Sequence, residues 1–244
     1  MSLILCLFSF FFCKNFKLVV IFALHMANYI FKDKIGKKVG IGKLVCLARS
    51  YRKHAEEMHA TITDNPLIFL KPASSVIFNG DSIIIPKMSK CLHHEVELGV
   101  VIGKKCKNVS QKKALDYVLG YLVALDITAR DIQEEAKKHG WPWTIAKGFD
   151  TFAPISDVVL KDKVPNPNNI DLSLKVNGET RQNSNTNYMI YSVERIIEFI
   201  SEIMTLEEGD LILTGTPEGV DKIVAGDVLE AKLGDFCFLK IDVR

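Results

Sequence analysis

The run HHEVELGVVIG at residues 93–103 constrains the fold more than any other stretch of the sequence. Its β-branched valines and isoleucine favour a strand over a helix. Because successive side chains of a strand point to opposite faces, Glu95 and Glu97 share one face. The other face is apolar and carries Val96, Leu98, Val100 and Ile102. The sequence therefore predicts a strand that brings two carboxylates to one place.

A third carboxylate closes the apolar run GYLVALDI at residues 120–127, where Asp126 occupies a position typical of valine or isoleucine. An isolated ionised carboxylate in a low-dielectric interior is too costly, so a buried Asp126 needs a proton, a partner or a metal ion. With Glu95 and Glu97 it makes an all-oxygen set, which suits Mg²⁺ or Mn²⁺ with positions left open for a substrate. In the alternative, both glutamates lie on a solvated strand face and Asp126 caps a helix that begins at Thr128.

The composition is that of a globular protein with one full-sized domain. The chain has 244 residues, of which 48% are hydrophobic and 25% charged, and it shows no internal repeat. Its formal net charge is +2 and no basic stripe is interleaved with aromatic residues, so nucleic acid is not an expected partner. The six cysteines include no C-x-x-C pair and no zinc spacing. We therefore expect reduced, buried thiols in an intracellular protein.

Residues 1–25 form an apolar extension that differs from the rest of the chain. Its two apolar runs are interrupted at residues 14–17, and neither approaches the roughly 20 residues that a membrane-spanning helix needs. Its lysines follow the first run and no small-residue cleavage site is present, which argues against a secretory signal. We expect either a poorly formed targeting segment or an artefact of gene modelling with Met26 as the working start, no membrane partner, and a folded domain over residues 26–244.

The remaining sequence predicts many short strands and a few short helices. Helices are expected over residues 50–60, 110–119, 128–140 and 191–204, with Ser50, Ser110 and Ser192 as N-caps and Gly140 as a stop signal. Asn177-Gly178 predicts a hairpin over residues 172–182. The regular alternation of strand and helix that a doubly wound sheet requires is missing. The pattern predicts a mixed, β-rich α+β fold.

Five segments carry a family resemblance: LHHEVELGVVIGK, LDITARDIQ, WPWTIAKGFD, LKVNGETRQ and MTLEEGDLILTGTPEGV. They follow one another in order over nearly the whole chain after Gly42, and together they resemble the fumarylacetoacetate hydrolase family, in particular its acylpyruvate hydrolase branch. The resemblance implies a rolled, mixed β-structure around one site, and a homodimer.

The resemblance also implies a role for each of nine residues. The metal ligands would be Glu95, Glu97 and Asp126. Contacts with the substrate would come from Arg130, Gln133 and Thr216, the last of them to a substrate carboxylate. The catalytic residues would be Lys147, beside the metal, and His54 with Glu57, a water-activating pair on a mobile lid.

Taken one residue at a time, plainer roles remain open. His54 and Glu57 are neighbours on one helical face, which in most proteins would be a solvated face. Lys147 could be a surface lysine, and Arg130 could pair with Glu134 at i+4. Thr216 could bond only the backbone of its own turn.

A few further residues near these motifs carry expectations of their own. His93 and His94 are expected to be structural or to support the site, and Met189 and Tyr191 to lie in the core. The chain departs from the family where Gly-Arg-Asn-Tyr is replaced by the residues at 48–51. If that glycine permits a positive φ, Ala48 would change the hinge of the lid.

The implied chemistry acts on 2-keto acids. Cleavage of the C3–C4 bond leaves a pyruvate enolate, whose charge the metal and Lys147 would stabilise. For an acylpyruvate, His54 assisted by Glu57 would activate a water molecule, whereas oxaloacetate would lose CO₂ without one. The resemblance thus implies an Mg²⁺- or Mn²⁺-dependent acylpyruvate hydrolase with oxaloacetate decarboxylase activity, in mitochondria or cytoplasm. The alternatives are an oxaloacetate keto–enol tautomerase or related isomerase, and a catalytically inactive dicarboxylate-binding protein.

Overall fold

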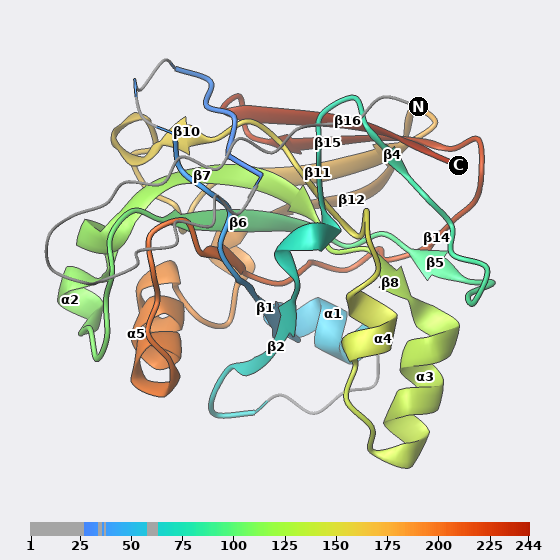
Figure 1. Ribbon diagram of the computed structural model, residues 1–244, viewed down its shortest axis with the longest axis horizontal. Coiled ribbons are helices and arrows are strands. Elements are labelled where there is room, and N and C mark those ends of the chain that lie inside the picture. The colour runs from blue at the N-terminus through green and yellow to red at the C-terminus, as the bar shows by residue number, and fades with distance from the viewer. Residues whose placement is uncertain (1–26, 34–35, 37, 58–62) are drawn as a thin grey trace, which may run out of the picture.

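The computed structural model describes residues 27–33, 36, 38–57 and 63–244 (Figure 1). The apolar extension expected at residues 1–25 lies outside this part of the chain. Within the described part, no helix is long and apolar enough to cross a membrane.

An eight-stranded mixed sheet forms the centre of the fold. Strands β1 and β13 run parallel, as do β3 and β9, and the other pairs are antiparallel. In spatial order the sheet holds β2 (Leu67–Lys71), β1 (Leu44–Ala48), β13 (Leu211–Leu213), β6 (Val96–Ile102), β7 (Val118–Leu125), β9 (Ala153–Ile155) and β3 (Val76–Phe78), with β10 (Val159–Leu160) paired to β7.

Two smaller sheets complete the β-structure. The first has the order β12 (Glu179–Asn185), β11 (Asp171–Val176), β15 (Val228–Leu233), β16 (Cys237–Val243), β4 (Ser82–Ile83), and the second has the order β14 (Lys222–Ile223), β5 (Leu92–His93), β8 (Thr128–Ala129). The predicted hairpin is confirmed in β11 and β12. Its turn residues Asn177 and Gly178 both have positive φ, at 52° and 83°, as a type I′ turn requires.

The main hydrophobic core fills the space between the eight-stranded and five-stranded sheets (Figure 1). The four apolar residues predicted on one face of the strand, Val96, Leu98, Val100 and Ile102, all belong to it. Every residue of β6 is buried, and so is Glu95 just before it, so the solvated strand face is wrong as an alternative. The opposite face of the sheet packs against a second apolar cluster that includes Tyr29, Val39 and Ile41.

In the described part of the chain, five short α-helices lie mainly at one end of the sheets (Figure 1). They are α1 (Arg52–Glu57), α2 (Gln111–Ala114), α3 (Arg130–His139), α4 (Thr144–Lys147) and α5 (Val193–Ile203), and 3₁₀ turns cover Ala73–Ser75, Leu115–Tyr117, Lys161–Lys163 and Thr186–Tyr188. Two cap predictions are confirmed. The Ser192 hydroxyl accepts a hydrogen bond from the Arg195 N–H, and Gly140 ends α3 at φ 67°.

The structure corrects several of the predicted helix bounds. The helix expected over 110–119 ends at Ala114, because Val118 already pairs with Ile102 in the central sheet. The helix expected from Thr128 begins at Arg130, since Thr128 and Ala129 form β8. The Ser110 side chain makes no capping hydrogen bond. The two changes of helix bounds arise because strand pairing with distant residues overrides local helix propensity.

Other side chains lie largely as expected. The described cysteines are free thiols, of which Cys46, Cys106 and Cys237 are buried and Cys91 is partly exposed. Met189 and Tyr191 pack, partly buried, against the main core. The residue with positive φ ahead of α1 is Arg49, at 58°, and not Ala48. Replacement of the family glycine by Ala48 therefore leaves a backbone that alanine can adopt.

Candidate active site

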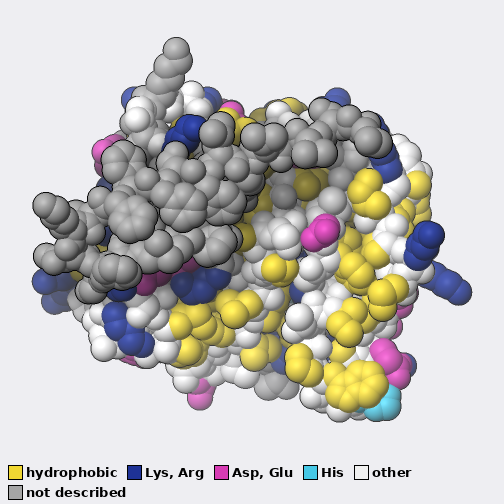
Figure 2. All heavy atoms as spheres, in the orientation of Figure 1, with side chains coloured by type: hydrophobic (Ala, Val, Ile, Leu, Met, Phe, Trp, Pro, Cys, Tyr) yellow, Lys and Arg dark blue, Asp and Glu magenta, His cyan; other side chains and the backbone are white. Residues whose placement is uncertain are grey.

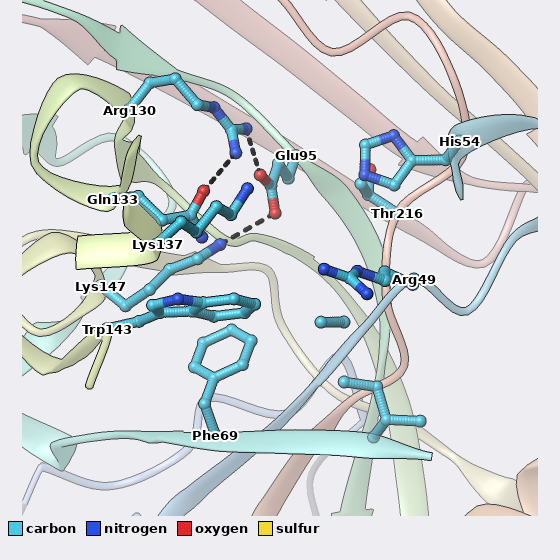
Figure 3. Close-up of a pocket in the computed structure, with 12 residues that line it drawn as sticks. Arg49, His54, Phe69, Glu95, Arg130, Gln133, Lys137, Trp143, Lys147 and Thr216 are labelled. Carbon is cyan, nitrogen blue, oxygen red and sulfur yellow. Dashed lines mark hydrogen bonds and ion pairs between the residues drawn. The ribbon is translucent and has the colours of Figure 1, made fainter. Parts of the chain in front are cut away.

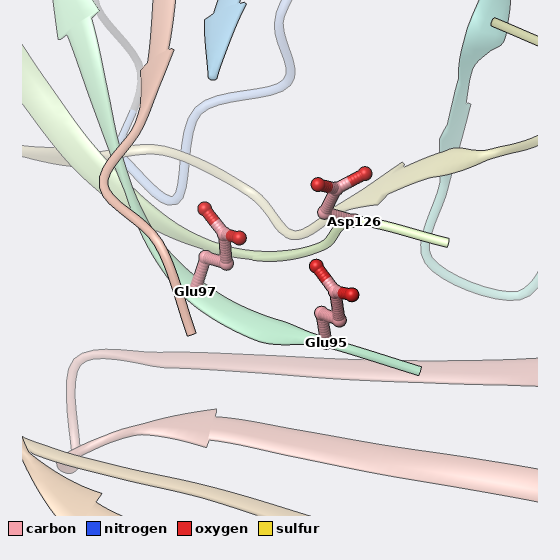
Figure 4. Close-up of side chains that lie close together, drawn as sticks. All are labelled: Glu95, Glu97 and Asp126. Carbon is pink, nitrogen blue, oxygen red and sulfur yellow. The ribbon is translucent and has the colours of Figure 1, made fainter. Parts of the chain in front are cut away.

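Three carboxylates meet where β6 begins and β7 ends (Figure 4). Strands β6 and β7 are antiparallel, and the Asp126 N–H donates to the Glu95 carbonyl at 2.8 Å, so these two residues face each other across the strand pair. Each of Glu95, Glu97 and Asp126 offers an oxygen within 4.8 Å of the others, and all three are buried. The alternating strand thus converges the carboxylates as the sequence predicted.

Three buried or nearly buried cations balance this negative charge. Lys147 donates to Glu95 at 2.9 Å and to Asp126 at 2.6 Å, and its third N–H goes to the Thr128 hydroxyl at 2.6 Å. Arg130 donates to the other oxygen of Glu95, and Lys71 donates to Asp126 at 2.5 Å. Three of the plainer alternatives are therefore wrong: Lys147 is not a surface lysine, Arg130 does not pair with Glu134, and the Asp126 side chain does not cap a helix.

Glu97 stands apart, because its carboxylate is the least satisfied of the three. One oxygen accepts the Gly215 N–H at 2.7 Å, and the other is buried with no hydrogen-bond partner. Burial, together with the negative charges of Asp126 and Glu95, raises the pKa of Glu97 well above the usual range for glutamate. A divalent cation among these oxygens would offset the cost of ionising the buried Glu97 beside two other carboxylates. The donor set therefore fits Mg²⁺ or Mn²⁺.

A cavity of about 150 Å³ opens above the carboxylates (Figure 3). Its lining includes Glu95 as the one acidic residue and, as cations, Arg49, Arg130, Lys137 and Lys147. Phe69 and Trp143 close one side with their rings in an edge-on contact. This largely cationic lining favours a small anionic ligand.

His54 lies across this cavity from Arg130 and Lys147 (Figure 3). Its side chain is buried, and its Nδ1 is 3.3 Å from the Glu57 carboxylate, which also accepts the Gly219 N–H. Because a carboxylate only accepts, Nδ1 carries a proton, and in the neutral imidazole Nε2 is then the nitrogen with the lone pair. The helical face that bears His54 is thus turned inward, while Glu57 remains exposed at its edge.

Arg130 is held by contacts on three sides. Besides Glu95, it donates to the Gln133 side-chain oxygen at 2.6 Å and to His93 Nδ1 at 3.3 Å. Burial, followed by the charge of Arg130, lowers the pKa of His93 to about 4, so His93 is neutral and can accept. The Gln133 oxygen is taken, which leaves its NH₂ group to donate to a ligand. His93 therefore supports the site, as expected.

Thr216 also lines the cavity, but its hydroxyl is already used. It donates to the Val96 carbonyl at 2.9 Å and accepts from Gln182 at 2.9 Å. The Gln182 amide is oriented by the Val96 N–H and the Pro217 carbonyl, both at 3.0 Å. The predicted contact of Thr216 with a substrate carboxylate would need this hydroxyl to leave Val96, or the Thr216 backbone N–H to act instead.

Several residues of the site were missed in the sequence. Lys71 and Gln182 are buried partners of site residues, and Lys137 lines the cavity. A lysine that ends an otherwise apolar strand, LIFLK, could have drawn attention to Lys71. Gln182 and Lys137 lie in polar stretches that carry no comparable local signal.

Comparison with known proteins agrees with this geometry. The family profile described as fumarylacetoacetate (FAA) hydrolase C-terminal matches residues 43–244. The chain belongs to the fumarylacetoacetate hydrolase family. The chain is 51% identical over 202 residues to a protein of Arabidopsis thaliana named oxaloacetate tautomerase FAHD1, mitochondrial, covering 83% of this chain and 91% of that protein. The Bos taurus protein of the same name is 47% identical over 201 residues, 82% of this chain and 91% of its own length.

A solved structure of this family shares the fold closely. Fumarylpyruvate hydrolase from Pseudomonas aeruginosa, in complex with Mn²⁺ and pyruvate, superposes with a TM-score of 0.86 at 31% identity, covering 93% of this chain and 98% of the other. The expected fold, a β-rich α+β structure with a curled sheet and few short helices, is confirmed. The family comprises enzymes, and its named relatives include a hydrolase and tautomerases.

Proposed function

We propose that this chain is a divalent-cation-dependent enzyme that interconverts the keto and enol forms of oxaloacetate. One observation carries the proposal: three buried carboxylates converge beneath a small cavity, and four cationic side chains line that cavity. Relatives that are 47% and 51% identical and bear the name oxaloacetate tautomerase support it. The activity that the sequence predicts first, acylpyruvate hydrolysis with oxaloacetate decarboxylation, is the second candidate below.

Glu95, Glu97 and Asp126 would hold Mg²⁺ or Mn²⁺. The bound cation would supply Lewis-acid polarisation of the keto oxygen and orient the keto acid. The Mn²⁺ and pyruvate in the Pseudomonas aeruginosa neighbour support both the type of cation and the type of ligand.

The protein's own residues would stabilise the negative charge that develops on the enolate oxygen. Burial alone would lower the pKa of Lys147, but Asp126 and Glu95 outweigh it and leave this pKa raised. Lys147 therefore stays an ammonium, and with its three N–H groups engaged it contributes positive potential rather than a proton. The NH₂ group of Gln133 and the remaining N–H groups of Arg130 can orient a carboxylate of the substrate.

The test follows enol-oxaloacetate by ultraviolet absorbance with the protein begun at Met26, in Mg²⁺ or Mn²⁺ and with a chelator. We expect rapid, chelator-sensitive loss of the enol and at least a hundredfold loss of rate in Glu97→Ala. Full activity of Glu97→Ala at saturating cation would overturn the proposed cation site. Stabilised melting by oxaloacetate without turnover would indicate a binding protein instead.

A second candidate function is favoured by the His54–Glu57 pair. With its proton on Nδ1, His54 presents Nε2 to the cavity as a base, and Glu57 would stabilise the imidazolium that forms. This arrangement suits attack of water on the C4 carbonyl of an acylpyruvate, which gives a carboxylic acid and pyruvate. Decarboxylation of oxaloacetate would need the same enolate stabilisation without the water. Pyruvate release from acetylpyruvate and from oxaloacetate, measured beside enol loss, separates these activities.

We also propose a homodimer, which the surface around β2 supports. A largely apolar groove of about 1000 Å³ runs along this edge strand and the segment 141–144. Leu67, Leu70 and Trp141 are exposed there, and Figure 2 shows hydrophobic side chains gathered over this region. Apolar patches of this kind commonly mark protein interfaces. Sedimentation should give the mass of a dimer, and Leu70→Glu should shift it towards the monomer. A monomer mass for the unchanged protein would contradict this proposal.

The compartment is proposed from the relatives alone. The plant and bovine proteins are named mitochondrial, and we propose that this chain acts in mitochondria or cytoplasm. Fractionation of cells that express the full chain and the chain begun at Met26 tests whether residues 1–25 direct it to mitochondria. Secretion of the full chain would contradict the proposal.

A further inference from the structure

One face of α3 forms a wall of the cavity. Arg130, Gln133 and Lys137 are spaced i, i+3 and i+7, so they lie one above another on the same side of the helix. All three line the cavity, and Figure 3 shows their side chains extending into it. Arg130 and Gln133 lie at the buried end, whereas Lys137 is exposed at the mouth. This face of α3 therefore presents polar side chains along the cavity from its buried end to its opening.

The cations that line the cavity differ in how they are neutralised. Arg130 and Lys147 both form ion pairs with Glu95. Lys137 has no carboxylate oxygen within 4.0 Å among the residues that the structure describes, and its ammonium lies 5.6 Å from the centre of the Trp143 ring. Although the Lys137 side chain is exposed at the mouth, its ammonium is partly desolvated there, and this desolvation, followed by the positive charge of Arg130, lowers its pKa. The mouth thus has an excess of positive charge, which an anionic group would relieve.

We propose that Lys137 binds the second carboxylate of a dicarboxylic 2-keto acid and so selects dicarboxylates over monocarboxylates. The proposal rests on the proposed function for the orientation of the ligand: the 2-keto acid end lies over Glu95, Glu97 and Asp126, and the remaining carboxylate points to the mouth. The ring of Trp143 supports the aliphatic chain and ammonium of Lys137 on one side, which limits where its charge can go. Lys137 would then determine specificity, not the chemistry.

The test compares two ligands that cannot enolise, by calorimetry in the presence of Mn²⁺, and the keto acid is checked for loss of CO₂ in the same samples. Oxalate resembles the 2-keto acid end and lacks a distant carboxylate, whereas 3,3-difluorooxaloacetate has one and cannot enolise. Lys137→Met should weaken binding of difluorooxaloacetate by about tenfold or more, the worth of a charge-assisted hydrogen bond, and change oxalate binding by less than about twofold. Lys137→Arg should stay close to wild type. The matched control is Lys138→Met, because Lys138 points to solvent and pairs with Glu135.

Each contrary outcome has a distinct meaning. An equal loss for both ligands, or no loss for either, would overturn the role of Lys137 in selecting dicarboxylates. The kinetic counterpart is a rise in KM for oxaloacetate of about tenfold with kcat changed far less. If wild type showed no turnover of enol-oxaloacetate but kept the Lys137-dependent difference between the two ligands, the proposed function would fail and the carboxylate contact would stand.

Discussion

The ammonium of Lys71 lies 2.5 Å from a carboxylate oxygen of Asp126, and both side chains are buried. Lys71 also donates to the Ile127 carbonyl at 3.0 Å, while the other oxygen of Asp126 receives Lys147 at 2.6 Å. Asp126 is therefore held from two sides by ammonium groups of β2 and α4. This arrangement fixes the carboxylate in place before any ligand binds.

Removal of Lys71 should destabilise the protein strongly. Lys71→Met keeps most of the side-chain volume but leaves part of the Asp126 charge buried without its partner, which should cost about 3–5 kcal/mol in the free energy of unfolding. Denaturant titration measures this loss. The control is Lys240→Met, whose exposed pair with Glu230 at 3.3 Å should be worth less than about 1 kcal/mol. Equal losses in the two variants would contradict the argument.

Removal of the Glu97 charge should have opposite effects with and without a cation. Because burial and two neighbouring carboxylates disfavour its ionised form, Glu97→Gln should raise the stability of the cation-free protein by about 1–3 kcal/mol. The same change should abolish the rise in Tm that Mn²⁺ gives to wild type. Thermal melts in chelator and in Mn²⁺ test both parts, with the exposed Glu207→Gln as control. A Mn²⁺ shift that survives in Glu97→Gln would remove Glu97 from the cation site.

Loss of His54 should separate hydrolysis from tautomerisation. His54→Asn removes the base that would activate water, so pyruvate release from acetylpyruvate should fall by about 10²–10⁴-fold. Conversion of enol-oxaloacetate should fall by less than about tenfold, since charge stabilisation by Lys147 and by the cation that Glu95, Glu97 and Asp126 would hold remains. Glu57→Gln should show the same pattern more weakly. Parallel loss of both activities would mean that His54 also transfers the proton of the keto–enol step.

The Asp131 carboxylate of α3 accepts hydrogen bonds from residues 89 and 90, and the stability that this tether contributes should depend on pH. Burial raises the pKa of Asp131, but hydrogen bonds from the Lys90 N–H at 2.8 Å and the Ser89 hydroxyl at 2.7 Å outweigh it, so the pKa is lowered. A lowered pKa in the folded protein means that the stabilisation is present at neutral pH and declines as the pH falls through that value, below about 3.9.

Asp131→Asn should therefore cost roughly 1 kcal/mol at pH 7, after allowance for partial exposure. Its difference from wild type should shrink toward pH 3 in urea titrations. The control is Asp116→Asn, whose side chain is exposed on a 3₁₀ turn. A difference that stays constant from pH 7 to pH 3 would show that the charge of Asp131 does not hold this tether.

Local signals in the sequence determined a good part of this protein. Alternation over residues 93–103 placed Glu95 and Glu97 on one face, the Asn177-Gly178 pair specified a hairpin, and Ser192 and Gly140 marked helix ends. Each of these features depends on residues within a few positions of one another, so backbone sterics and side-chain periodicity suffice to predict them. Together with the family motifs they also indicated which side chains would form the site.

The tertiary structure alone decided which charges meet and where the helices stop. Lys71 reaches Asp126 across 55 residues of sequence and Gln182 reaches Val96 across 86, so their roles arise only when the sheets assemble. Val118 leaves its predicted helix because the pairing with Ile102 satisfies its backbone in the sheet. Lys137 looks like an ordinary lysine in the last turn of a helix until the fold sets it at the mouth of a cationic cavity. Such properties depend on long-range packing and on summed electrostatics, which no local pattern encodes.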